Sequence, residues 1–70
     1  MKGGDKMDFA ERLIQFRAKN NLTQKQAAEI LSVNISMIYF YESGKNKPSK
    51  KNKIIIDEKM KNYERRADNV

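Results

Sequence analysis

Residues 22–44 constrain the fold more than any other part of the chain, because they carry the signals for two short helices joined by a tight turn. Thr23 is suited to cap the first helix, and Gln26, three residues later, completes a capping-box pattern. Asn34 is suited to cap the second helix. Gly44 is suited to end it, because glycine tolerates the left-handed conformation that many helix ends adopt.

Two further helices are predicted on either side of this stretch. One begins at a cap on Asp8 and runs to about Asn20; its apolar residues recur at three- and four-residue spacing and are Phe9, Leu13 and Phe16, with Ile14 widening the stripe. The other begins at a cap on Ser49 and runs to about Tyr63. Its predicted buried residues are Ile55, Ile56, Met60 and Tyr63, with Ile54 partly exposed. Residues 1–7 and 64–70 are predicted to be flexible, which leaves one all-α domain over residues 8–63.

The composition excludes several classes of function. Seventy residues are enough for one small domain. The absence of cysteine and histidine removes disulfides, thiolate metal sites and the usual nucleophile–base pairs of enzymes. The longest apolar run, residues 54–56, is far too short to span a membrane. We therefore predict a cytoplasmic protein that is not an enzyme, with no metal, cofactor, small-molecule substrate or membrane partner.

The charge pattern favours a nucleic acid as partner. The net charge is +6, which alone is also compatible with ordinary solubility. The distribution is more informative, because five lysines fall within nine residues directly after the second helix of the pair: Lys45, Lys47, Lys50, Lys51 and Lys53. Lysines at this place are suited to hold the phosphates that flank a helix in the major groove, although a solvated loop would have the same composition.

The sequence resembles the Cro/CI-type (XRE-like) helix-turn-helix family of phage and bacterial regulators over residues 9–60. The matching positions are Leu22, Thr23, Gln24, Ala28, Leu31, Val33, Ile38, Glu42, Gly44, Lys45, Lys47, Pro48 and Ser49. The resemblance implies a compact four-helix, lambda-repressor-like DNA-binding domain, with the usual fifth helix absent. It also implies double-stranded operator DNA as the partner, regulation of transcription as the function, and a homodimer as one arrangement. A generic helical bundle has no need of all these residues together.

The resemblance also assigns roles to individual residues. It implies an ion pair between Arg17 and Glu42 that fixes the first helix against the third. Residues that face DNA in the family correspond to Gln24, Asn34, Ile35, Ser36, Met37, Tyr39, Phe40, Ser43, Lys45 and Lys47.

The outward positions of the third helix depart from the family pattern. The family typically has polar side chains there, whereas this chain has Ile35, Met37, Tyr39 and Phe40. Three explanations are open: contact with thymine methyl groups or base wedging, coverage by the chain's own fourth helix or tail, or docking of another protein. In the third case the chain would be a phage anti-repressor or modulator that binds a cognate repressor.

Overall fold

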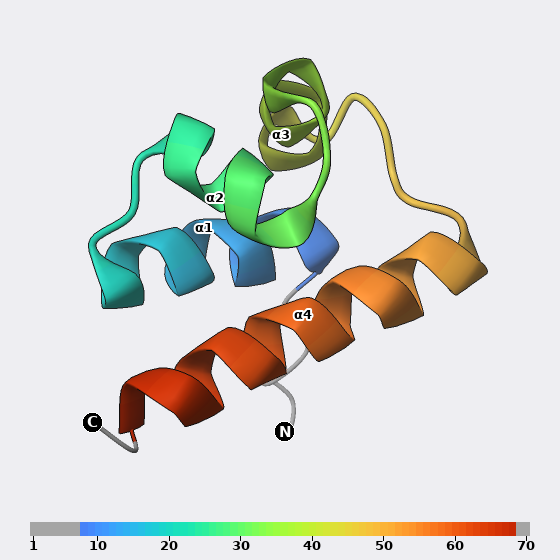
Figure 1. Cartoon of the computed structure of the whole chain (residues 1–70). Coiled ribbons are helices and arrows are strands. Elements are labelled where there is room, and N and C mark those ends of the chain that lie inside the picture. The colour runs from blue at the N-terminus through green and yellow to red at the C-terminus, as the bar shows by residue number, and fades with distance from the viewer. Residues whose placement is uncertain (1–7, 69–70) are drawn as a thin grey trace, which may run out of the picture.

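The computed structural model describes residues 8–68, which form four helices and no strand (Figure 1). The helices are α1 (Phe9–Asn20), α2 (Gln24–Leu31), α3 (Ile35–Ser43) and α4 (Lys50–Asp68). α4 runs along the lower side of the molecule in Figure 1, and α3 stands at the opposite side. The all-α prediction is confirmed. The predicted flexible segment 1–7 and the last two residues lie outside the described part of the chain.

The first two helices begin at the residues that the sequence indicates. The Asp8 carboxylate accepts a hydrogen bond from the backbone N–H of Glu11 at 3.0 Å. The Thr23 hydroxyl accepts from the backbone N–H of Gln26 at 3.0 Å, and the Gln26 side chain accepts from the backbone N–H of Thr23 at 2.9 Å. This reciprocal pair satisfies two backbone donors that a helix start would otherwise leave free.

The boundaries of α3 agree only in part with the prediction. Asn34 occupies the cap position, as predicted, but its side chain makes no capping hydrogen bond. Gly44 ends the helix at φ +80°, as predicted, in a conformation that disfavours a side chain. The turn before α3 contains a second left-handed residue, Ser32, at φ +60°.

α4 is longer than predicted. The Ser49 hydroxyl accepts the backbone N–H of Asn52 at 3.2 Å, which confirms the predicted start. The helix continues to Asp68 rather than ending near Tyr63. Within this extension, the Glu64 carboxylate accepts a hydrogen bond from the Asn20 side chain at 3.0 Å. This contact between α4 and the end of α1 has no signal in the local sequence, which explains why the prediction stopped short.

All four helices contribute to one core. Leu13, Leu31 and Ile38 are its largest fully buried side chains, from α1, α2 and α3. The other buried residues are Phe9, Phe16, Ala27, Ala28, Tyr41, Ile56 and Met60. Two edge-to-face aromatic pairs join distant segments: Phe9 with Tyr41 at 5.3 Å between ring centres, and Phe16 with Tyr63 at 5.8 Å.

Some predicted core positions face solvent. Ile55 is 43% exposed and Ile14 is 41% exposed, so the burial predicted for Ile55 is wrong. Ile56 and Met60 lie one helical turn apart and both face the core. Ile55 is rotated about 100° around the helix from Ile56, which takes it out of the core and leaves it exposed. Tyr63 is only partly buried against the core.

Candidate nucleic-acid interface

An ion pair joins α1 to the end of α3. The Nε of Arg17 lies 2.6 Å from one carboxylate oxygen of Glu42, and the Nη2 lies 2.9 Å from the other. This two-pronged contact fixes the relative angle of the two groups as well as their distance. The side chain of Glu42 is 9% exposed and that of Arg17 is 23% exposed, so water screens the pair only partly.

Two further contacts extend this ion pair to the start of α2. The side-chain amide of Gln24 donates to Glu42 at 3.1 Å, and the Nη1 of Arg17 donates to the carbonyl of Leu22 at 3.1 Å. The hydrogen bonding of Arg17 to the Glu42 carboxylate, helped by the charge of that carboxylate, raises the pKa of Arg17 above the usual value of arginine, against the opposing effect of burial. The network therefore holds α1, α2 and α3 in one arrangement.

The outer side of α3 is exposed and mostly apolar. Tyr39 is 49% exposed, Phe40 39% and Ile35 37%. Neither α4 nor any other part of the described chain covers them, so the proposed coverage by the fourth helix is wrong. The opposite side of α3 carries Ile38 and Tyr41, which are buried in the core. α3 is thus anchored on one side and open on the other.

The remaining predicted contact residues of α3 divide into two groups. Asn34 and Ser36 are exposed beside Ile35, where their polar groups are accessible. Met37 is partly buried and packs against the core, so its predicted outward position is wrong. Residue 37 is one position before the buried Ile38, and the helix places it at the border between the two sides.

The segment after α3 supplies positive charge. Lys45 and Lys47 are both exposed. The hydroxyl of Ser43 donates to the carbonyl of Phe40 at 3.1 Å and accepts from the backbone N–H of Lys45 at 3.4 Å, so it stabilises the helix end.

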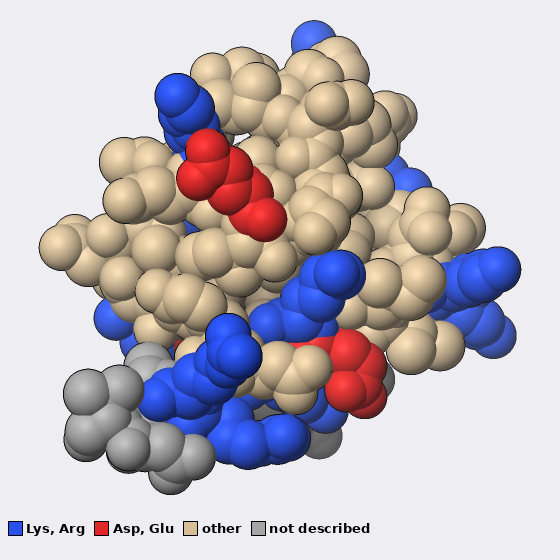
Figure 2. Space-filling model, viewed as in Figure 1, with Lys and Arg blue, Asp and Glu red and all other residues tan. Residues whose placement is uncertain are grey.

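In Figure 2 the blue Lys and Arg side chains gather over α4, whereas uncharged side chains prevail over α2 and α3.

A family model described as helix-turn-helix matches residues 13–60, well over half of the chain. The chain belongs to this helix-turn-helix family. Members of the family are DNA-binding transcription regulators of the XRE type rather than enzymes, and this chain is such a regulator. The comparison with curated proteins and the comparison with solved structures each found no match.

The match covers α2, the turn and α3, which form the helix-turn-helix unit, together with most of α1 and α4. No helix in the part that the structure describes is long and apolar enough to cross a bilayer. Acidic residues in residues 8–68 do not gather into a group of three that would hold a metal ion.

Sequence reasoning missed part of the network that supports the helix-turn-helix unit. It assigned Gln24 to DNA, but the side-chain amide of Gln24 donates to Glu42. It also missed the ion pair between Arg12 and Asp57, 2.9 Å apart, which holds α4 against α1. These two residues are 45 positions apart in the sequence, so no local pattern links them.

Proposed function

We propose that the chain is a Cro/CI-type regulator that reads double-stranded operator DNA by inserting α3 into the major groove. The observation that carries this proposal is the asymmetry of α3, which is anchored through Ile38 and Tyr41 while Ile35, Tyr39 and Phe40 are exposed. A helix held rigidly behind and open in front has the form that major-groove recognition requires.

Polar and apolar groups on this surface have different roles in the proposal. Asn34 and Ser36 supply hydrogen-bonding groups for base edges at the start of α3. Ile35, Tyr39 and Phe40 pack against thymine methyl groups, which are the apolar feature of the major groove. We therefore expect an operator in which A·T pairs lie opposite the middle of α3.

The DNA backbone would be held on both sides of α3. The backbone N–H groups at the start of α2, near Gln24, lie at the positive end of the helix dipole and suit a phosphate. Lys45 and Lys47 follow α3 and are accessible to the next phosphates along the strand.

Selection of duplexes from a random-sequence pool tests the proposal. We expect recovery of a common motif and an affinity, measured by fluorescence anisotropy, that falls steeply with salt because phosphate contacts release counterions. Phe40→Ser should relax the base preference opposite α3. Lys61→Ala, on α4, is the matched control and should change the affinity little. Recovery of no common motif would overturn the proposal.

A second function is favoured by the low polarity of the same surface. Three large apolar side chains on one short helix, with lysines beside them, match the centre and rim of a protein interface. On this alternative the chain is a modulator that binds a cognate repressor through α3. It predicts a nuclease-resistant complex with a repressor that tolerates salt. Phe40→Asp would abolish that complex, whereas Lys47→Ala would leave it intact.

A further inference from the structure

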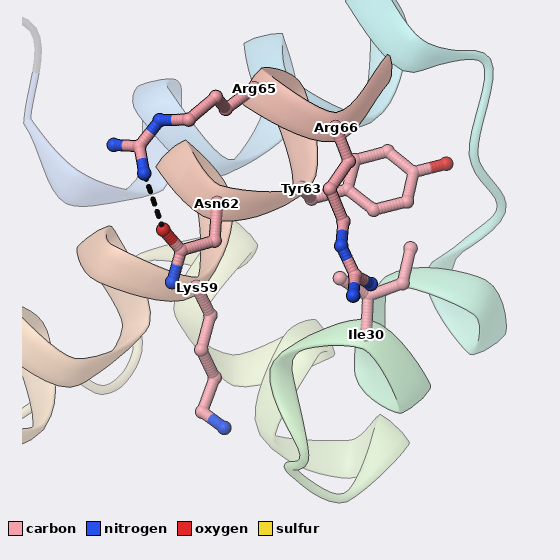
Figure 3. A pocket seen from close by; sticks show the side chains of 6 residues that line it. All are labelled: Ile30, Lys59, Asn62, Tyr63, Arg65 and Arg66. Atoms are coloured by element: carbon pink, nitrogen blue, oxygen red, sulfur yellow. Dashed lines mark hydrogen bonds between the residues drawn. The ribbon is translucent and has the colours of Figure 1, made fainter. Parts of the chain in front are cut away.

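A groove separate from the outer side of α3 runs between α2 and α4. Its main part is an open cavity of about 640 Å³. The side chains that line it come from the end of α2 and the last turns of α4: Ile30, Lys59, Asn62, Tyr63, Arg65 and Arg66 (Figure 3). Residues 59, 62, 63 and 66 follow the three- and four-residue spacing of a single helix face. The sequence therefore directs two cations, Lys59 and Arg66, and an aromatic ring toward one hollow, and Arg65 lines it from the neighbouring position.

A second, smaller hollow continues the groove toward the start of α4. Lys59 lines both hollows, and the second is otherwise mostly apolar, with Val33, Ile55 and Ile56 among its lining residues. The groove extends along α4 from Asn52 to Arg66, which is fourteen residues later. Its length is therefore about 21 Å, at about 1.5 Å per residue. One end of the groove is thus apolar and the other is basic.

Two acidic residues of α4 lie on its α1 side, away from this basic end. Asp57 pairs with Arg12 and Glu64 lies 3.8 Å from Lys19, so both carboxylates face α1. Among the side chains of residues 8–66, no ion pair involves Lys59 or either of the arginines that line the groove. Arg65 donates a hydrogen bond to the side-chain oxygen of Asn62 at 3.4 Å, and this partner is uncharged (Figure 3).

We propose that this groove binds an acidic segment of another protein. Carboxylates of the segment would pair with Lys59 and Arg66, and its apolar side chains would cover Ile55 and the ring of Tyr63. The mixed basic and apolar lining favours a protein segment over a nucleic acid, because a nucleic-acid backbone has no apolar groups to place against an isoleucine. Burial by the segment also accounts for the 43% exposure of Ile55.

The groove is accessible when α3 is engaged. Tyr41, on the inner side of α3, lines its apolar end, whereas Ile35, Tyr39 and Phe40 line neither hollow. A protein bound in the groove would therefore be carried by the regulator to the DNA site. This function goes beyond DNA binding and does not depend on it.

The test uses the full chain and two fluorescein-labelled eight-residue peptides: one of alternating glutamate and leucine, and one with glutamine in place of glutamate. We expect the acidic peptide to bind and to shift the NMR signals of Ile30, Lys59 and Arg66. The double variant Lys59→Glu/Arg66→Glu should weaken binding at least about fivefold, because two attractions become repulsions. The matched control Lys51→Glu/Lys61→Glu has the same net charge and should retain binding within about twofold.

Circular dichroism would verify that both double variants keep their helices, as expected for substitutions at the surface. Equal weakening by the two double variants would show attraction by net charge alone and would overturn the proposal. So would equal binding of the glutamine peptide, the absence of shifts at the three groove residues, or displacement of the acidic peptide from the groove by a DNA duplex.

Discussion

Replacing Glu42 with glutamine is expected to destabilise the fold by about 2–3 kcal/mol. The Glu42 carboxylate accepts three hydrogen bonds, two from Arg17 and one from Gln24. Removing one member of a fully buried pair costs about 3–5 kcal/mol, and an exposed pair contributes only about 0–1 kcal/mol. Exposures of 9% and 23% for the two side chains place this pair nearer the buried limit.

This loss is large for so small a domain. At about 0.05–0.15 kcal/mol per residue, 70 residues give a total stability of about 4–10 kcal/mol. The variant should therefore melt about 8–24 °C lower, measured by circular dichroism at 222 nm. Lys19→Gln is the matched control: Lys19 lies 3.8 Å from Glu64 with 73% of its side chain exposed, and its loss should cost less than about 0.5 kcal/mol.

A double-mutant cycle isolates the interaction itself. Arg17→Met, Glu42→Gln and the double variant should give a coupling energy of at least about 1.5 kcal/mol from urea denaturation. Because the folded-state pKa of Arg17 is raised, its stabilisation is complete below the ordinary pKa of arginine and is lost only as the pH rises through the raised value. Because Arg17 stays protonated throughout this range, its protonation should leave the coupling energy unchanged between about pH 7 and about pH 10. A coupling energy below about 0.5 kcal/mol would show that the contact between Arg17 and Glu42 does not stabilise the fold.

Three further outcomes are expected. Gly44→Ala should cost about 1 kcal/mol in urea denaturation, because the backbone there has φ +80° although nothing crowds a Cβ; no loss would contradict this. Ile38→Ala should cost about 3 kcal/mol or more, whereas Ile54→Ala, at a side chain that is 58% exposed, should cost less than about 0.5 kcal/mol. Lys45→Ala and Lys47→Ala should each reduce the slope of log affinity against log salt by about one for the selected duplex; unchanged slopes would place the phosphates elsewhere.

Local signals in the sequence were sufficient for most of the helix boundaries. The Thr23 and Gln26 pair and the left-handed Gly44 depend on residues close together in the chain, and both are present in the structure. Asn34 was expected to cap α3 for the same reason, but a capping residue type does not determine where its side chain points. The side chain of Asn34 is exposed at this position, where another group can bind it.

Features that depend on distant segments were harder to predict. The extension of α4 to Asp68 places Glu64 against Asn20, and periodicity within the last residues contains no sign of this contact. The exposure of Ile55 was missed for a related reason. Three consecutive isoleucines do not indicate which side of the helix faces the core. Only the packing partners of α4 decide which of the three faces the core.

In the proposed site, too, some contacts were predicted from the sequence and others were not. The contact between Arg17 and Glu42, which the resemblance implied, is present with two-pronged geometry. The hydrogen bond that Gln24 adds to it was not anticipated, because a residue at a helix start was assigned to DNA alone. Met37 was assigned outward because it lies among exposed residues, but the helix places it at the border of the exposed side, where it packs partly against the core.

NMR mapping of the protein during titration with the selected duplex would test most directly whether α3 contacts the DNA. If α3 reads DNA, the largest shifts will fall on Ile35, Tyr39 and Phe40, with small changes at the exposed Ile54 of α4. Saturating DNA that leaves the signals of α3 unmoved, while signals elsewhere shift, would contradict the claim that α3 is the surface that reads DNA.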